Sequence, residues 1–213
     1  MTNAVASPVW AELLGQPEAI AQLEIAIRGK ADGVYHAWLI TGPPGSGRSN
    51  LALAFAAALQ CPDQGCGTCH SCTLAKAGTH PDITVLSTDK VQITVAEIRE
   101  LVKSAAFGSA MGKFKILIIE DADRMQATAS NILLKTLEEP PKHVIFIMAT
   151  TELQKVPDTI ISRCQVFTFK KASEEVEIFK AALRTLEGIE LISKGTLKLS
   201  LFGWEKTLDE YQK

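Results

Sequence analysis

The sequence predicts an α/β fold built on a doubly wound, mainly parallel sheet. Apolar runs of strand length alternate with segments of helical periodicity, and this alternation favours parallel strands joined by right-handed crossovers. A glycine-rich loop joins the first of these strands, Trp38-Leu39-Ile40, to an Ala- and Leu-rich helix. With 213 residues, of which 46% are hydrophobic, the chain can bury a sizeable core and hold one such domain plus a smaller part.

The charge and hydropathy of the chain limit its partners and its location. The formal net charge is −2 and the pI is about 6.1, so any contact with nucleic acid has to be local or supplied by partner proteins. No apolar run reaches the ~18 residues of a membrane span, and the N-terminal stretch lacks the basic and apolar regions of a signal peptide. We therefore expect a cytoplasmic protein with no membrane partner.

The first predicted helix covers Glu18 to Ile27. Its apolar residues recur at spacings of three and four, so they lie on one helical face. The preceding turn, Leu14-Gly15-Gln16, resembles the adenine-side motif that comes before the first helix in AAA+ ATPases. This short motif gains weight from its position upstream of the glycine-rich loop.

The glycine-rich loop has the spacing of a phosphate-binding P-loop, except that Arg48 replaces the usual Lys. Glycines let backbone N–H groups face a β-phosphate, the helix N-terminus favours negative charge, and the Ser49 hydroxyl can bind Mg²⁺. A guanidinium can hold phosphate without supporting the geometry of transfer. The alternative is a Gly/Pro turn before an ordinary helix. The predicted site for ATP or ADP with Mg²⁺ consists of Gly42, Pro43, Pro44, Gly45, Ser46, Gly47, Arg48 and Ser49.

A cluster of four cysteines follows the P-loop helix, at spacings of four, two and two intervening residues: Cys61, Cys66, Cys69 and Cys72. Turn-forming residues separate them, and this arrangement suits tetrahedral thiolate ligation of structural Zn²⁺. His70 could replace one thiolate, but ligation by all four cysteines is the simpler assignment. An iron–sulfur cluster or a redox dithiol is the alternative. Four protein ligands leave no open coordination position, so the expected knuckle has a structural role.

A second nucleotide element consists of the apolar run 114–119 and the acidic residues Glu120 and Asp121. Carboxylates at the C-terminal end of a buried strand form the Walker B pattern, in which one holds Mg²⁺ and the next orients or deprotonates the attacking water. The usual order, Asp then Glu, is inverted here. Together with Arg48, the inversion predicts weak or absent hydrolysis. The alternative is that these acidic residues cap the following helix.

Three more strands and two more helices are expected after the cysteines. The strands cover 82–86, 144–149 and 165–169, and the helices cover 95–107 and 129–139. Ile93 and Ile98 are expected on the apolar face of the first of these helices, and Pro140 stops the second. Thr150 and Thr151 follow a buried strand, where a polar group beside a γ-phosphate would be useful.

Four features together resemble a bacterial replicative clamp-loader subunit of the delta-prime or gamma/tau type, in the AAA+ family. They are the P-loop, the inserted cysteines, NILLKTLEEPP (131–141) and ATTELQKVPDTIISRCQVFTF (149–169). The resemblance covers residues 9–170. It implies a component of the DNA polymerase III holoenzyme, a DNA-directed DNA polymerase and nucleotidyltransferase, that helps load the sliding clamp. The implied partners are the delta and gamma/tau subunits, the clamp, and primed DNA reached through the assembled complex.

The resemblance also implies roles for single residues. Thr150 or Thr151 falls at sensor 1, and we assign Thr151. Arg163 falls at the arginine finger that enters a neighbouring subunit's ATP site, although a salt bridge to a surface carboxylate is the alternative. Arg48 and the Glu120-Asp121 order are similar to delta-prime, whereas the sequence after Phe146 is more similar to gamma/tau.

The same resemblance divides the chain into two parts. Residues 1–170 form the AAA+ nucleotide-binding domain, with the zinc knuckle 61–72 inserted, and residues 171–213 form a partial, helical lid-like tail. Family members continue into a C-terminal collar domain that holds the pentamer together, and no collar is expected in this sequence. The expectation is a fragment, a shortened form, or a different assembly.

Two rival functions are considered beside clamp loading. A free-standing AAA+ remodelling ATPase needs intact hydrolysis and self-assembly, so turnover by the purified chain would favour it. A zinc-knuckle module that binds nucleic acid needs basic and aromatic residues to grip phosphates and stack bases, and the cysteine segment nearly lacks them.

Overall fold

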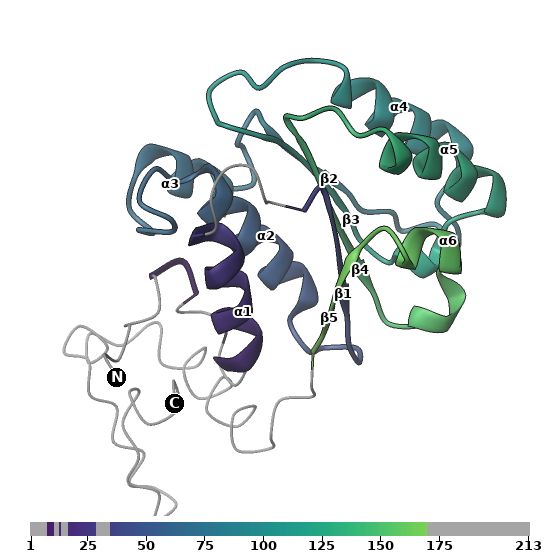
Figure 1. The fold of residues 1–213 in the computed structure, drawn as a ribbon, viewed down its shortest axis with the longest axis horizontal. Coiled ribbons are helices and arrows are strands. Elements are labelled where there is room, and N and C mark those ends of the chain that lie inside the picture. The colour runs from purple at the N-terminus through teal and green to yellow at the C-terminus, as the bar shows by residue number, and fades with distance from the viewer. Residues whose placement is uncertain (1–7, 11–12, 14–16, 29–34, 170–213) are drawn as a thin grey trace, which may run out of the picture.

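The computed structural model describes residues 8–10, 13, 17–28 and 35–169 (Figure 1). Its strands are β1 (Ala37–Thr41), β2 (Ile83–Leu86), β3 (Lys115–Ile119), β4 (Val144–Thr150) and β5 (Gln165–Thr168). Its helices are α1 (Pro17–Arg28), α2 (Arg48–Gln60), α3 (His70–Lys76), α4 (Val95–Ala105), α5 (Ala127–Glu138) and α6 (Asp158–Ile161). Short 3₁₀ turns are η1 (Pro8–Trp10), η2 (Ala122–Arg124) and η3 (Leu153–Lys155). The lid-like tail predicted at 171–213 and the Leu14-Gly15-Gln16 turn lie outside the described residues.

The five strands form one parallel sheet in the order β2-β3-β4-β1-β5, which confirms the predicted fold class. The chain leaves β1 for the distant edge strand β2, returns through β3 and β4, and then passes β1 to form β5. Connections from β1 and β4 therefore depart in opposite directions. In open parallel sheets, such a switch point at the carboxyl ends of the strands is where ligands bind.

Helices cover both faces of the sheet (Figure 1). Helices α1 and α2 pack on one face, and α4, α5 and α6 pack on the other. Side chains alternate along each strand, so Trp38 and Ile40 of β1 pack with α2, whereas Leu39 packs with the α4 and α5 side. All three are fully buried, as expected for a parallel strand covered on both faces. Among the described residues, no helix is long and apolar enough to cross a bilayer.

The helix predicted over 95–107 is shorter than expected, and Ile93 is not part of it. A capping box sets its start, because the Thr94 hydroxyl accepts the Glu97 N–H while the Glu97 carboxylate accepts the Thr94 N–H at 2.7 Å. Ile93 is nevertheless fully buried, in an isolated bridge with Met125. At the other end, α4 stops at Ala105, and the His143 Nε2 lies 3.2 Å from the Ala105 carbonyl oxygen.

Two buried polar side chains hold the loop between α4 and β3. The Asp82 carboxylate is fully buried and accepts three backbone N–H groups, those of Ala110, Met111 and Gly112, at 2.6 to 2.8 Å. Gln60, at the end of α2, accepts the Lys113 N–H at 3.1 Å and donates to the Phe114 carbonyl at 2.6 Å. Side chains far apart in the sequence thus fix the entry of the chain into β3.

The Asp82 carboxylate makes the stability of the domain depend on acid pH. Burial alone would raise the pKa of Asp82, but its three backbone donors and nearby Lys115 outweigh burial and hold the pKa below its usual range. A lowered pKa stabilises the fold above the unfolded value of about 4, and this stabilisation is lost as the pH falls through the folded value. We expect Asp82→Asn to flatten the acid limb of the unfolding curve measured by circular dichroism. Asp89→Asn, in an exposed loop, should leave the acid limb unchanged; an acid limb unaltered by Asp82→Asn would contradict this account.

Candidate nucleotide site and metal centre

The P-loop, the Walker B segment and the end of β4 meet at the carboxyl edge of the sheet. The P-loop follows β1, Glu120 follows β3, and Thr150 ends β4. Thr41 of β1 is in register with Thr150, and the N–H of Gly42 donates to the Thr150 carbonyl at 3.3 Å. The structure therefore brings together segments that lie far apart in sequence, such as Gly42 and Thr150. They converge at the switch point of the sheet.

The P-loop backbone depends on its glycines. Gly45 and Gly47 have φ angles of 75° and 90°, which side-chain-bearing residues rarely adopt, and Gly47 is the N-cap of α2. Ser46 is buried, and its hydroxyl has no hydrogen-bond partner among the described residues. A buried donor without a partner inside an anion-binding loop is suited to a ligand oxygen.

Arg48 turns back onto its own loop. Its Nη1 donates to the carbonyl oxygens of Gly42 and Pro43, the latter at 2.9 Å. Burial lowers the pKa of Arg48, while the charges of nearby acidic residues oppose this shift: Asp121, Asp123 and Glu120. The guanidinium thus bonds to the loop carbonyls and lies within the electrostatic influence of the acidic segment. Arg48 is also the first residue of α2.

The acidic segment after β3 is a tight turn. The N–H of Glu120 donates to the Leu86 carbonyl at 3.0 Å, so the segment extends the β2 and β3 pairing by one residue. Asp121 has a φ of 49°, in the left-handed region, and its carboxylate pairs with Arg124 at 3.4 Å. Asp121 occupies the N-cap position of η2, but its side chain makes no capping hydrogen bond there, so the capping role considered as an alternative is not observed.

Asp123 is a site residue that the sequence did not single out for a role. Its Oδ1 accepts the Thr150 hydroxyl at 2.5 Å and the Thr151 N–H at 3.3 Å. Thr150 is fully buried, and its Oγ1 also accepts the Glu152 N–H at 3.1 Å. Asp123 therefore connects the acidic segment to the segment predicted to hold sensor 1. The only sequence signal was its place two residues after Asp121.

The four cysteine sulfurs form a compact cluster, and all lie within 4.8 Å of one another. The Cys61 Sγ is 3.5 Å from the Cys66 Sγ and 3.7 Å from the Cys69 Sγ. Tetrahedral zinc with bonds of about 2.3 Å places its sulfurs about 3.8 Å apart. The cluster thus has the size of a tetrathiolate metal site, and His70 is not needed as a ligand.

Backbone N–H groups stabilise negative charge on the Cys66 sulfur, whereas burial raises the pKa of the Cys72 thiol. The Cys66 N–H points to the Cys61 Sγ at 3.4 Å, and the Cys69 N–H points to the Cys66 Sγ at 3.3 Å. The N–H groups of Thr68 and Cys69 lower the pKa of Cys66 to about 6. Thiolates are the metal-binding form of cysteine, so the surroundings of Cys66 favour ligation.

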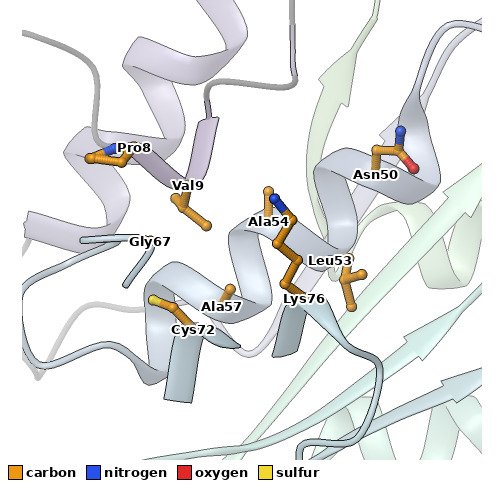
Figure 2. Close-up of a pocket in the computed structure, with 9 residues that line it drawn as sticks. All are labelled: Pro8, Val9, Asn50, Leu53, Ala54, Ala57, Gly67, Cys72 and Lys76. Atoms are coloured by element: carbon orange, nitrogen blue, oxygen red, sulfur yellow. The ribbon is translucent and has the colours of Figure 1, made fainter. Parts of the chain in front are cut away.

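The cysteine segment packs against the helix that begins at the P-loop. A pocket of about 290 Å³ lies between η1, α2 and the cysteine segment. Its lining includes Asn50 beside the P-loop and Cys72 of the cluster (Figure 2). The N–H of Val9 donates to the Gly65 carbonyl at 3.2 Å. On the other side, the His80 Nε2 lies 2.8 Å from the Ser71 hydroxyl. The cysteine segment is thus tied to η1 through Gly65 and, through Ser71, to His80 in the loop before β2.

Arg163 lies after α6, away from the P-loop in sequence and partly exposed. Its Nη2 pairs with the Glu138 Oε1 at 2.8 Å, and its Nη1 donates to the Thr159 carbonyl at 2.7 Å. The surface salt bridge considered as an alternative is therefore present in the isolated chain. Because the two side chains are 35% and 46% exposed, solvent weakens the attraction between them.

The fold and this site define a P-loop domain of the AAA+ type. Solved structures agree with the fold: a DNA polymerase III gamma subunit-related protein from Thermotoga maritima is 23% identical, with a TM-score of 0.59, covering 76% of this chain and 49% of that one. The Holliday junction branch migration motor RuvB from the same organism is 18% identical, with a TM-score of 0.52, covering 85% and 54%.

The family model for the DNA polymerase III delta subunit matches residues 15–173. The chain belongs to this family, which confirms its resemblance to bacterial clamp-loader subunits of the AAA+ type. DNA polymerase III subunit tau of Bacillus subtilis is 38% identical over 169 residues, which is 77% of this chain and 29% of that protein. Subunit tau of Escherichia coli K12 is 33% identical over 171 residues, covering 78% and 26%. The chain thus spans less than a third of these relatives.

Proposed function

We propose that this chain acts as a delta-prime-like subunit of the bacterial replicative clamp loader. In this role it helps place the sliding clamp on primed DNA for DNA polymerase III, together with delta and gamma/tau subunits. The contrast between its two arginines supports the proposal. Arg48 is turned onto the carbonyls of its own P-loop, whereas Arg163 stands at the surface beside α6. The chain is therefore suited to assist hydrolysis at a neighbour more than to hydrolyse ATP itself.

A gamma/tau-type ATPase subunit is the second candidate. It is favoured by the names of the relatives, which are tau, gamma and tau/gamma subunits. It would require steady ATP turnover at this chain's own site. A free-standing AAA+ remodelling ATPase would require turnover without any partner, and only the shared fold supports it.

Capture of partners from a bacterial lysate, with mass spectrometry of the bound proteins, tests the proposal. Recovery of delta, gamma/tau and the sliding clamp is the expected result. ATPase assays on the purified chain then separate the candidates, because a delta-prime-like subunit shows negligible turnover. Steady hydrolysis by the chain alone, with no clamp-loader protein recovered, would overturn the proposal.

The Arg48 contacts lead to a prediction about the chain's own nucleotide site. A bound phosphate has to replace the contacts between Arg48 and the carbonyls of Gly42 and Pro43, so we expect weak binding of ATP or ADP with Mg²⁺. Arg48→Lys removes the two-pronged donor and keeps the charge. It should tighten ATP binding by about fivefold, since one net hydrogen bond contributes about 1 kcal/mol. Isothermal titration calorimetry measures this, with Arg99→Lys on α4 as the matched control. Weaker binding after Arg48→Lys would mean that the guanidinium itself contacts the phosphates.

We further propose that the cysteine cluster holds one structural Zn²⁺. Cys61, Cys66, Cys69 and Cys72 supply four thiolates, and the spacing of their sulfurs and the N–H groups directed at them support this assignment. The metal would hold the turns of residues 61–72 against α2. No catalytic role is assigned to it, because four protein ligands fill a tetrahedral site.

A further inference from the structure

Two groups from different elements hold the Arg163 guanidinium. The Thr159 carbonyl belongs to α6, and the Glu138 carboxylate is at the end of α5. Each accepts from a different terminal nitrogen, at 2.7 and 2.8 Å. A planar group bonded through two of its nitrogens cannot rotate about its long axis without breaking one bond. The direction of the guanidinium is therefore fixed in the free chain.

Helix stability does not explain an acidic residue at position 138. Glu138 is the last residue of α5, where the helix dipole disfavours negative charge, and Glu139 adds a second carboxylate at the same end. The following Pro140 stops the helix whichever residue precedes it. Arg163 is the cation that lies against the Glu138 carboxylate. The ion pair that the structure describes for Glu138 is thus the one with Arg163.

The contact with Glu138 leaves Arg163 able to bind a second anion. A guanidinium has five N–H donors, and the two contacts use two of them. The side chain also remains 35% exposed. Glu138 can therefore hold the guanidinium while the remaining donors face a phosphate from outside the chain.

We propose that Glu138 is a positioning residue, which holds Arg163 in the orientation needed to enter the ATP site of a neighbouring subunit. This inference rests on the proposed finger role of Arg163. Hydrogen-bond donors that are already oriented lower the activation barrier of ATP hydrolysis, because they need not be ordered during the reaction. Loss of the carboxylate should therefore slow the neighbour's hydrolysis step and leave ATP binding there unchanged.

The test uses clamp loader reconstituted with this chain, and measures ATP hydrolysis in the presence of clamp and primed DNA. Glu138→Gln should lower kcat about two- to fivefold at constant KM, because a partly exposed ion pair contributes modestly. Glu138→Asp, which keeps the charge, should retain more activity than Gln. Glu139→Gln is the matched control at the same helix end and should behave as the unmodified chain.

A double-mutant cycle separates positioning from a general structural role. If Glu138 acts through Arg163, then Glu138→Gln has no further effect once Arg163→Ala is present. Equal losses in both backgrounds, or no loss in either, would overturn the inference while leaving the finger role standing. An Arg163→Ala chain with unchanged ATPase would instead refute the proposed finger, and the positioning role with it. Circular dichroism of each variant verifies that it is folded.

Discussion

Arg163→Ala is expected to reduce hydrolysis at the ATP site that this chain faces in the assembled loader by at least about 10²-fold. A fixed cation beside a neighbour's γ-phosphate neutralises charge that grows in the transition state, and removal of one preorganised donor costs about 10²–10³ in rate. Arginine fingers in GTPase systems reach about 10³–10⁵. Total ATPase of the complex should fall only in part, because other interfaces keep their own fingers. Stopped-flow phosphate release with clamp and primed DNA measures the loss.

The isolated Arg163→Ala chain should stay folded, because the Glu138 pair that it loses is partly exposed and worth about 0–1 kcal/mol. Arg163→Lys should restore little activity, since an ammonium keeps the charge without the planar pair of donors. Arg99→Ala, on the exposed surface of α4, serves as the control. Full ATPase and clamp loading with Arg163→Ala would show that the contact with Glu138 is only a surface salt bridge.

Cys66→Ser is expected to release the metal that copurifies with the chain, about one zinc per molecule. Loss of one thiolate leaves the metal with three protein ligands. The free energy of metal binding also stabilises the folded form of the segment that supplies the ligands, so loss of the metal destabilises that segment. The loss should loosen residues 61–76 and the adjacent half of α2, because α3 packs along α2. The sheet should remain folded. Elemental analysis measures the metal, and hydrogen exchange measures the loosening.

Cys164→Ser is the matched control for the metal prediction, because Cys164 lies outside the cluster and donates to the Ile160 carbonyl at 3.1 Å. It should keep the full zinc content. A preparation without zinc, or one with iron and visible absorbance, would contradict the assignment of zinc in this protein.

Features encoded within short stretches were predictable from the sequence. The strand, glycine loop and helix around Gly42 and Gly47 follow one another directly, and the cysteine spacings lie within one segment. Parallel pairing followed from the alternation of strands and helices, since each crossover needs a helix. The ends of helices were predicted less accurately. At the start of α4, the capping box between Thr94 and Glu97 outweighed the apolar periodicity that extended to Ile93.

The contacts that the sequence did not reveal join residues far apart in the chain. Asp82 binds a loop centred on Met111, Asp123 binds Thr150, and Arg163 binds Glu138. The local sequence does not reveal such partners. An acidic residue reads the same in the sequence whether or not a distant residue binds it in the fold. Arg48 was recognised as a departure from the P-loop pattern, but the direction of its side chain depends on loop carbonyls that only the folded backbone brings within reach.

The place of β1 in the sheet has a consequence for how the protein is made. β1 is synthesised before the other described strands, yet its two neighbours, β4 and β5, are the last of them to be made: Ala37 pairs with Phe146, and Trp38 pairs with Gln165. At about 5–20 residues per second, the ribosome needs roughly 5–20 s to make the hundred or so residues between the first partners. During this time Trp38 and its apolar neighbours have no strand to pair with. Cotranslational folding of the sheet centre is therefore delayed until β4 has left the exit tunnel.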